Sequence, residues 1–299
     1  MDMFTQLAVS GVMVGAVYGL IALGFVLIYK SSGVINFAQG ELVMMGAYFC
    51  YTGLNIMNLP SWLAFIFAFI LASILAVVVN RVCIRPLVGQ PLLAIIMMTI
   101  VLSIGLQAIA ILGWKAGQFK LAIFGKDIFF LGNAVIAETS LWAFGLSILG
   151  MLVFWTYFRR TKGGLAMRAV AENHQASRSV GVSISTVFSS AWIIASIVGA
   201  LGGILLATTS GVTLDLSHVG LKVLPVVLLG GLDSIPGALI GGVVIGVSEY
   251  MAVGYVDDIM IDLGFQGVGV RDVFPYILAI VILIVRPYGL FGQKRIERI

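Results

Sequence analysis

Charged side chains are scarce in this sequence. Of its 299 residues only 10% are charged, whereas 61% are hydrophobic and the mean hydropathy is +1.12. A soluble domain carries about 25% charged residues because its surface faces water. The 17 basic and 13 acidic residues do not cover a water-facing surface for a chain of this length. Lipid must therefore be the solvent for most of the chain.

Residues that build metal sites are also rare. The two cysteines, Cys50 and Cys83, lie in or beside apolar segments. We expect both to be small thiols packed in the core. No metal-ligand spacing surrounds them or the two histidines, His174 and His218. No cluster of His, Asp or Glu within the apolar segments is suited to metal binding or acid–base chemistry. We expect no metal, no cofactor and no enzymatic activity in this chain.

The start of the chain lacks the basic region of a signal peptide. Residues 1–6 contain Asp2 and neither Lys nor Arg. The apolar run that follows, Leu7–Tyr29, is long enough to cross about 30 Å of hydrocarbon. We expect it to be a retained first membrane helix.

The apolar runs predict an all-α, polytopic membrane protein. We expect a single domain over residues 1–299, with eight to ten hydrophobic helical segments, one of them re-entrant or broken. The predicted helices after the first are Leu42–Leu59, Trp62–Asn80, Leu92–Trp114, Leu141–Phe158, Thr186–Ala207, Ile235–Met251 and Val273–Val285, with a shorter apolar piece at Leu221–Gly231.

Basic residues gather in three gaps, at residues 81–85, 159–178 and 294–298. The positive-inside rule places these gaps in the cytoplasm. Residues 208–272, which include an acidic gap around Asp257, Asp258 and Asp262, must then start and finish outside. At 1.5 Å per residue the piece ending at Gly231 is too short for a full crossing. With the helix that follows, this piece predicts either a down-and-up pair of helices or a re-entrant hairpin. The sequence does not decide on which side of the membrane the N-terminus lies.

Polar residues inside the apolar segments are candidate functional groups. Glu41 and Glu249 lie near the ends of their predicted segments, so we expect contact with interfacial water. Gln107 lies deep in its helix and predicts hydrogen bonding between helices. Glycines at small-xxx-small spacing, such as Gly11 with Gly15, predict close helix packing.

The longest charged gap, residues 159–184, predicts a cytoplasmic helix. We expect Gly163 and Gly164 to break the preceding helix, and Leu165–Val180 to form one amphipathic helix closed by Gly181. Such a helix is either a plain connector or a docking element for a partner. The residues alone leave both readings open.

Several motifs occur in one order along nearly the whole chain. They are Gly19-Leu-Ile-Ala-Leu-Gly-Phe-Val-Leu-Ile-Tyr, Gly33-Val-Ile-Asn-Phe-Ala-Gln-Gly-Glu41, Arg85-Pro-Leu, Gly164-Leu-Ala-Met-Arg-Ala-Val-Ala-Glu-Asn173, Leu229-Gly-Gly-Leu-Asp-Ser-Ile-Pro-Gly237 and Arg286-Pro-Tyr-Gly-Leu-Phe-Gly292. With these motifs the sequence resembles the permease subunits of branched-chain amino-acid ABC transporters, of the high-affinity leucine/isoleucine/valine type that pairs with a second, different permease. The histidine usual in the family's Asn-Phe-Ala-His-Gly motif is Gln39 here, which puts a proton role at this position in doubt.

The resemblance implies a multi-pass permease of the bacterial inner (plasma) membrane. It implies four partners: ATP-binding ABC subunits, a second permease, a periplasmic solute-binding protein and an amino-acid substrate, with no nucleic acid. No Gly-x-x-x-x-Gly-Lys-Ser/Thr loop occurs, so we expect ATP hydrolysis in separate subunits. The stretch 159–184 is similar to the family's coupling helix, and the residues expected to couple to the ATPase are Arg168, Ala169, Glu172, Asn173 and Gly181.

For the translocation path we expect glycines that permit irregular backbone and polar side chains that bind a polar solute. Irregular backbone at membrane depth is tolerated only where it is buried in protein or lines a cavity. The expected path residues are Asn36, Gln39, Gly230, Gly231, Ser234 and Gly237.

Two other functions remain open from sequence. A urea or amide ABC permease of the same superfamily would share most motifs. An ATP-independent secondary carrier or channel is the other alternative. Interruptions near residues 36 and 233 do not match when the chain is halved, which weighs against an inverted-repeat carrier.

Overall fold

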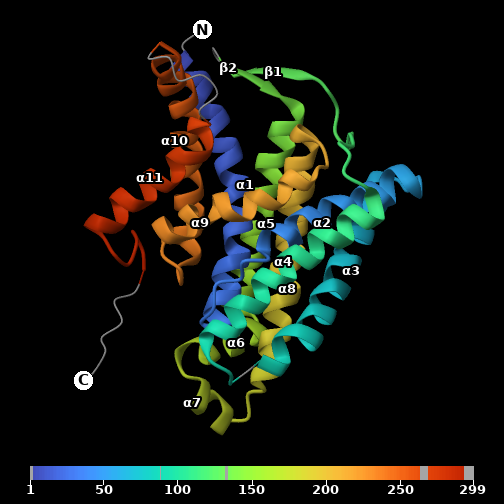
Figure 1. The fold of residues 1–299 in the computed structure, drawn as a ribbon, viewed down its shortest axis with the longest axis vertical. Helices are drawn as coiled ribbons and strands as arrows, with labels where there is room; N and C mark the ends of the chain where they lie inside the picture. Colours follow the sequence, from blue (N-terminus) through green and yellow to red (C-terminus); the bar gives the residue numbers. More distant parts are fainter. Residues whose placement is uncertain (1–2, 88, 132–133, 263–268, 293–299) are drawn as a thin grey trace. The chain divides into compact units, whose positions relative to one another are not determined.

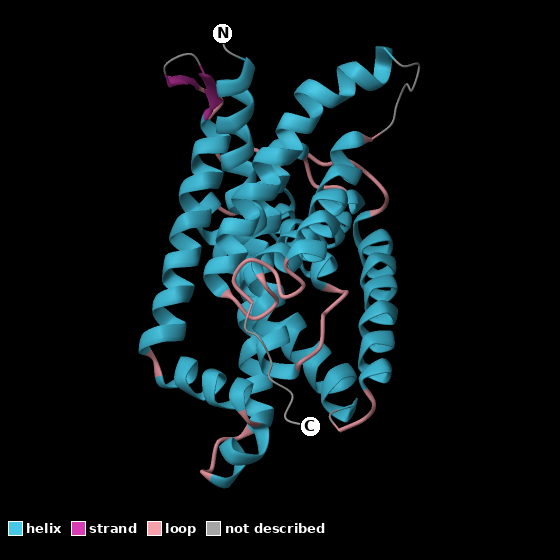
Figure 2. Ribbon diagram, turned by 90° about the vertical axis from the view of Figure 1, so that its left-hand side faces the viewer, coloured by secondary structure: helices cyan, strands magenta, loops and turns pink. Residues whose placement is uncertain are grey.

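Helices form most of the protein in the computed structural model, which describes residues 3–87, 89–131, 134–262 and 269–292 (Figures 1 and 2). Short π-helical turns, η1 (Thr52–Ile56) and η2 (Asn80–Ile84), and 3-10 turns, η3 (Arg85–Leu87) and η4 (Leu214–Ser217), adjoin them. The α-helices are α1 Met3–Ser32, α2 Gln39–Tyr51, α3 Ser61–Val79, α4 Leu92–Trp114, α5 Glu138–Arg160, α6 Lys162–Glu172, α7 His174–Ser179, α8 Ile184–Ser210, α9 His218–Gly230, α10 Ile235–Asp262 and α11 Val270–Val285.

Six helical stretches among the described residues are long and apolar enough to cross a membrane. The predicted helical membrane fold is therefore confirmed at this level. Helices α2, α9 and α11 have 13, 13 and 16 residues, short of the roughly 20 that a full crossing needs. The predicted total of eight to ten segments is not established by these six. The six stretches are Met3–Ser32, Ser61–Leu87, Leu92–Trp114, Glu138–Arg160, Ile184–Ser210 and Ile235–Asp257.

The chain divides into two compact units. Unit 1 comprises residues 1–22, 124–148 and 222–299, and unit 2 comprises residues 23–123 and 149–221. Both units draw on distant parts of the sequence, and α1, α5 and α9 each contribute residues to both. The helices of each unit pack through a different set of small residues.

In unit 2, small residues bring α2 and α3 close to α8. Gly46 of α2 lies against Ala200 of α8, where an added methyl group would overlap the alanine. Along α3 every fourth residue from Ala64 to Ala76 is an alanine and is buried. Every fourth residue from Ile66 to Ile74 is an exposed isoleucine. A stripe four residues apart lies on one helix face, so α3 packs on its alanines and turns its isoleucines toward lipid.

In unit 1, glycines join α1 to α10. Gly11 and Gly15 lie against the backbone of α10 at Gly242 and Gly246, so close that a Cβ at either position in α1 would overlap main-chain atoms. The small-xxx-small spacing had predicted close helix packing of this kind. Lipid is as apolar as the helices, so van der Waals contact between backbones replaces the hydrophobic effect here.

A small antiparallel sheet was not predicted from the sequence. Strand β1 (Ile128–Leu131) pairs with β2 (Ala134–Ala137) within unit 1 (Figure 2). Gln6 of α1 holds it: its Nε2 donates to the carbonyl of Val135 at 2.9 Å, and its Oε1 accepts from the Val135 amide at 2.7 Å. Both backbone groups of Val135 are thereby satisfied by one side chain.

Candidate functional site

The break between α1 and α2 is built on two buried amides in unit 2. Asn36 Oδ1 accepts from the Ala38 amide at 3.1 Å, an Asx-type turn that leads into α2. Gln39 Nε2 donates to the Ala195 carbonyl of α8 at 3.3 Å, and the side chain fits beside Gly24 and Gly199. Both amides are fully buried. They bind the break to α8, and Asn36 also lines a cavity of about 430 Å³.

Glu41 is the centre of a second buried polar group in unit 2. Its Oε1 accepts from Ser103 Oγ at 2.7 Å and from Gln107 Nε2 at 3.0 Å, both on α4. Gln107 Nε2 also donates to Ser217 Oγ of η4 at 3.2 Å. The predicted hydrogen bonding of Gln107 between helices is thus confirmed.

The expectation that Glu41 contacts interfacial water was wrong. Its side chain is only 4% exposed, because α4 and η4 cover the first turn of α2. The position in the first turn favours a carboxylate, since the helix dipole is positive there. Oε2 is buried without a hydrogen-bond partner among the described residues.

The predicted hairpin around residues 230–237 is a close-packed turn between α9 and α10 in unit 1. Gly230 and Gly237 face each other backbone to backbone, so a side chain at either would displace the other. Gly231 has φ +100°, which favours glycine. Ser234 Oγ accepts from the Gly237 amide at 3.0 Å and thereby caps the start of α10.

The chain after α11 completes this turn. The amide of Leu290 donates to the Leu229 carbonyl at 2.7 Å, and that of Phe291 donates to the Gly230 carbonyl at 3.2 Å. The last carbonyls of α9 are therefore satisfied by main chain from the segment after Arg286. Of the six expected path residues, Gly230, Gly231, Ser234 and Gly237 belong to this turn and the other two to the break in unit 2.

The coupling stretch forms two helices, so the prediction of one helix over Leu165–Val180 was wrong. Helix α6 begins at Lys162, with Thr161 as its N-cap, and includes both glycines that were expected to break the chain. It ends at Glu172, because Asn173 adopts an extended backbone and its Oδ1 accepts from the Ala176 amide at 2.9 Å. Asn173 thus starts α7 as its N-cap.

Arg168 and Gly181 have distinct structural roles in the coupling stretch. Arg168 Nη1 donates to the carbonyls of Phe158 and Arg159 at 2.9 and 3.3 Å, and its guanidinium lies over the Phe158 ring at 5.6 Å. It therefore joins α6 to the end of α5, where the last carbonyls lack helical partners. Gly181 has φ +84° after α7, as a C-terminal glycine commonly does.

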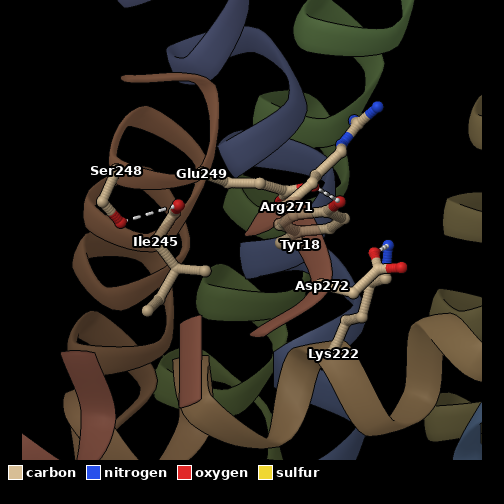
Figure 3. Close-up of polar contacts among 7 residues, drawn as sticks. All are labelled: Tyr18, Lys222, Ile245, Ser248, Glu249, Arg271 and Asp272. Atoms are coloured by element: carbon tan, nitrogen blue, oxygen red, sulfur yellow. Dashed lines mark hydrogen bonds and ion pairs between the residues drawn. The ribbon is translucent and has the colours of Figure 1, made fainter. Parts of the chain in front are cut away.

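A charged group in unit 1 contains residues from α1, α9, α10 and α11 (Figure 3). Glu249 of α10 is fully buried, and its Oε1 accepts from Arg271 Nε at 2.6 Å and from Tyr18 Oη at 3.4 Å. Lys222 and Asp272 form a second ion pair. Glu249 was expected near interfacial water; that was wrong, because α10 continues to Asp262 and places Glu249 inside the helix.

With this geometry established, comparison with known proteins adds the family. The family model described as "Branched-chain amino acid transport system / permease component" matches residues 7–285. The chain belongs to this permease family.

Curated relatives agree over the full length of the permease. It is 30% identical to the high-affinity branched-chain amino acid transport system permease protein LivH of Salmonella typhimurium, over 99% of this chain and 98% of that protein. It is 28% identical to BraD of Pseudomonas aeruginosa over the same shares. It is 27% identical to a probable LivH of Methanocaldococcus jannaschii, over 94% and 90%. The resemblance drawn from the motifs is confirmed.

A solved structure shares the fold of the permease. PsaBC from Streptococcus pneumoniae, determined in complex with a Fab, aligns with 97% of this chain and 94% of its own, at a TM-score of 0.50 and 11% identity. An identity this low supports a common fold and nothing finer.

Sequence reasoning missed the ion pair between buried Glu249 and Arg271. Arg271 falls two residues before the predicted start of the last helix, outside every predicted segment. Ser103 and Gln107 carried a detectable signal, because polar residues four apart on an apolar helix share one face. No local pattern links either residue to Glu41, since that contact depends on how α2 packs against α4.

Proposed function

We propose that this permease is the membrane subunit of an ABC importer that moves branched-chain, or related, amino acids across the bacterial inner membrane. The whole chain, residues 1–299, would act as one transmembrane permease domain. The observation that carries the proposal is the family match over residues 7–285. The relatives named as high-affinity branched-chain amino acid permeases support the substrate class.

ATP binding and hydrolysis would take place in separate ATP-binding subunits that dock on residues 159–184. The exposed face of this stretch supports the proposal: Leu165 is 59% exposed and Val180 is 78% exposed, although both are apolar. Glu172, between them in sequence, is exposed as well. These exposed side chains are available for contact with a docked subunit.

Motion of the docked subunits would reach the membrane helices through Arg168. Its bonds to the end of α5 make α6 and α5 move together, which two-state gating requires of a coupling element. Ala169 contributes through its carbonyl, which accepts from the Asn173 amide at 3.1 Å and closes α6. In this proposal Arg168, Ala169, Asn173 and Gly181 shape the coupling stretch, and Glu172 contacts the partner.

The path for the solute would involve the two irregular stretches. Asn36 and Gln39 shape the break between α1 and α2 with their amide groups. Gly230, Gly231, Ser234 and Gly237 would permit the α9–α10 turn to change shape. A periplasmic binding protein would deliver the amino acid, and a second permease would supply the other half of the path.

Uptake of labelled solutes tests the function. Cells with and without this chain, carrying the ATP-binding genes, second permease gene and binding-protein gene beside it, are given labelled leucine, urea or an aromatic amino acid. We expect ATP-dependent uptake of leucine that disappears without the chain. Uptake of urea alone would support the amide-permease alternative, and uptake that persists without the ATP-binding subunits would contradict an ABC importer.

A further inference from the structure

A polar cavity in unit 2 joins two arginines that are far apart in the sequence. Its volume is about 380 Å³, and Arg85 of η3 and Arg178 of α7 both line it. Ser183 and Ser185, at the start of α8, line it too. The cavity thus brings hydroxyl groups to the same place as two guanidinium groups.

Neither arginine has a carboxylate partner among the described residues. The two ion pairs in the described part of the chain involve Lys222 and Arg271. Two like charges that line one cavity repel each other, and the repulsion is stronger beside hydrocarbon than in water. An anion between them would remove this repulsion and accept hydrogen bonds from both guanidinium groups.

A second cavity, the one that Asn36 also lines, adjoins the first, and most of its wall is apolar. Arg178, Ile184 and Phe188 line both, and the second cavity has a volume of about 430 Å³. Its wall continues over Ile84, Ile95 and Trp192. A ligand that fills both cavities has an anionic head and an apolar body.

The surroundings favour a lipid over a soluble ligand. Leu92 in α4, which lines the larger cavity, is 56% exposed, so apolar surface continues from that cavity onto the outside of unit 2. The basic gap at residues 81–85 is one of the three that charge bias places in the cytoplasm. Basic pockets between membrane helices on that side commonly bind anionic lipid headgroups.

We propose that these two cavities bind an anionic phospholipid of the cytoplasmic leaflet. Its phosphate lies between Arg85 and Arg178, and an acyl chain lies along Ile84, Ile95 and Trp192. Because Arg178 belongs to α7, the lipid holds the coupling stretch against η3. The site is additional to the transport function, and lipid binding is measured without transport.

The test is binding of phosphatidylglycerol to the purified full-length protein, measured by native mass spectrometry against phosphatidylcholine of the same acyl chains. We expect wild-type protein to prefer phosphatidylglycerol. The double variant Arg85→Gln/Arg178→Gln should bind it about thirty-fold more weakly, since each basic residue contributes about 1 kcal/mol to such binding. Both residues are exposed, so the fold should survive, as a size-exclusion profile will show.

Arg81→Gln is the matched control. Arg81 lies one helical turn before Arg85, is also exposed, and lines neither cavity. We expect it to leave phosphatidylglycerol binding nearly unchanged. An equal loss in Arg81→Gln, or equal wild-type binding of the two lipids, would show only diffuse surface charge and overturn the proposal.

Two further measurements identify the source of the anion. Ile95→Trp, with Ile95→Phe as a milder variant, fills the second, mostly apolar cavity and should weaken phosphatidylglycerol binding while both arginines remain. Inorganic phosphate and leucine are added as competitors. Displacement of the lipid by phosphate would assign the site to a free anion, and displacement by leucine would assign it to the substrate; either result overturns the lipid proposal.

Discussion

At the scale of single residues, the pair of Glu249 and Arg271 should contribute to the stability of unit 1. Glu249 is fully buried, and breaking a buried pair by removing one partner leaves an uncompensated charge. Arg271→Met should therefore lower the free energy of unfolding by about 3 kcal/mol. Thermal or denaturant unfolding in detergent measures this.

The double variant Glu249→Gln/Arg271→Met is the control for that measurement. It removes both charges, so most of the lost stability should return. If removal of the Glu249 charge restores no stability to the Arg271→Met protein, the uncompensated charge is not the cause of the loss.

Glu41 allows a second measurement at this scale. Glu41→Ala would remove the acceptor of Ser103 and one of the two acceptors of Gln107, and a lost hydrogen bond costs about 0.5–1.5 kcal/mol. Glu41→Gln keeps an acceptor oxygen and should cost less. Glu172→Gln, on an exposed residue, serves as the comparison. A Glu41→Ala protein as stable as wild type would contradict the hydrogen-bond network.

Sequence reasoning located these polar residues but not their partners. Glu41, Gln107 and Glu249 were noticed because each is a polar residue within or beside an apolar run. Their burial and their partners depend on packing between helices that are distant in sequence, for which a single sequence carries no local signal. The error in both glutamates had one cause, since helices were expected to end where the charge appears.

At the scale of elements, the contact between α1 and α10 is sensitive to side-chain size. A Cβ at Gly15 would meet the main chain of Gly242 and Val243. Gly15→Val should therefore force the helices apart and lower stability by about 1–3 kcal/mol. Gly105→Ala in α4 is the control, because nothing lies within 4 Å of a Cβ there. Equal effects of the two changes would contradict the close contact.

The coupling stretch gives a functional prediction for α6 and α7. Glu172→Ala should reduce the stimulation of partner ATPase activity by loaded binding protein, while protein stability stays the same, because the side chain is exposed. Asn173→Ala should reduce it through loss of the α7 cap, at a cost of about 1 kcal/mol. Unchanged stimulation in both variants would remove these residues from the coupling surface.

Element bounds were predictable where the apolar pattern ended at a clear signal. Helix α4 has the predicted bounds, Leu92–Trp114, because Pro91 precedes it and polar residues follow. The division of the coupling stretch at Asn173 was missed, since its alanines favour one continuous helix and the cap acts only once the backbone turns. The β1–β2 sheet was missed because each strand has only four residues.

At the scale of the whole molecule, the side of each loop is testable. Charge bias and parity place residues 159–178 inside and the stretch around Lys126 outside. In a protein with Cys50 and Cys83 replaced, a cysteine at Ser179 should react only with membrane-permeant reagent in intact spheroplasts. A cysteine at Lys126 should react with impermeant reagent as well. Both positions are exposed. Reversed labelling would invert the predicted orientation.

The family and the helical membrane architecture were predictable from sequence, whereas the number of crossings was not. Motifs in a fixed order identified the family, and the hydrophobic composition indicated that lipid surrounds most of the chain. Crossing number depends on whether α2, α9 and α11, each shorter than a full span, reach both interfaces. Their depth is fixed by packing against other helices and not by their own hydropathy.

The division of α3 into a packed and a lipid-facing side has a consequence for the bilayer itself. Trp62 is exposed near its start and Arg81 is exposed just past its end, residues typical of the two membrane interfaces. Arg81 lies nineteen positions after Trp62, a separation of about 28 Å along a helix. Helix α3 therefore matches a particular hydrocarbon thickness, and a thicker bilayer must either thin around it or draw Arg81 below the headgroups.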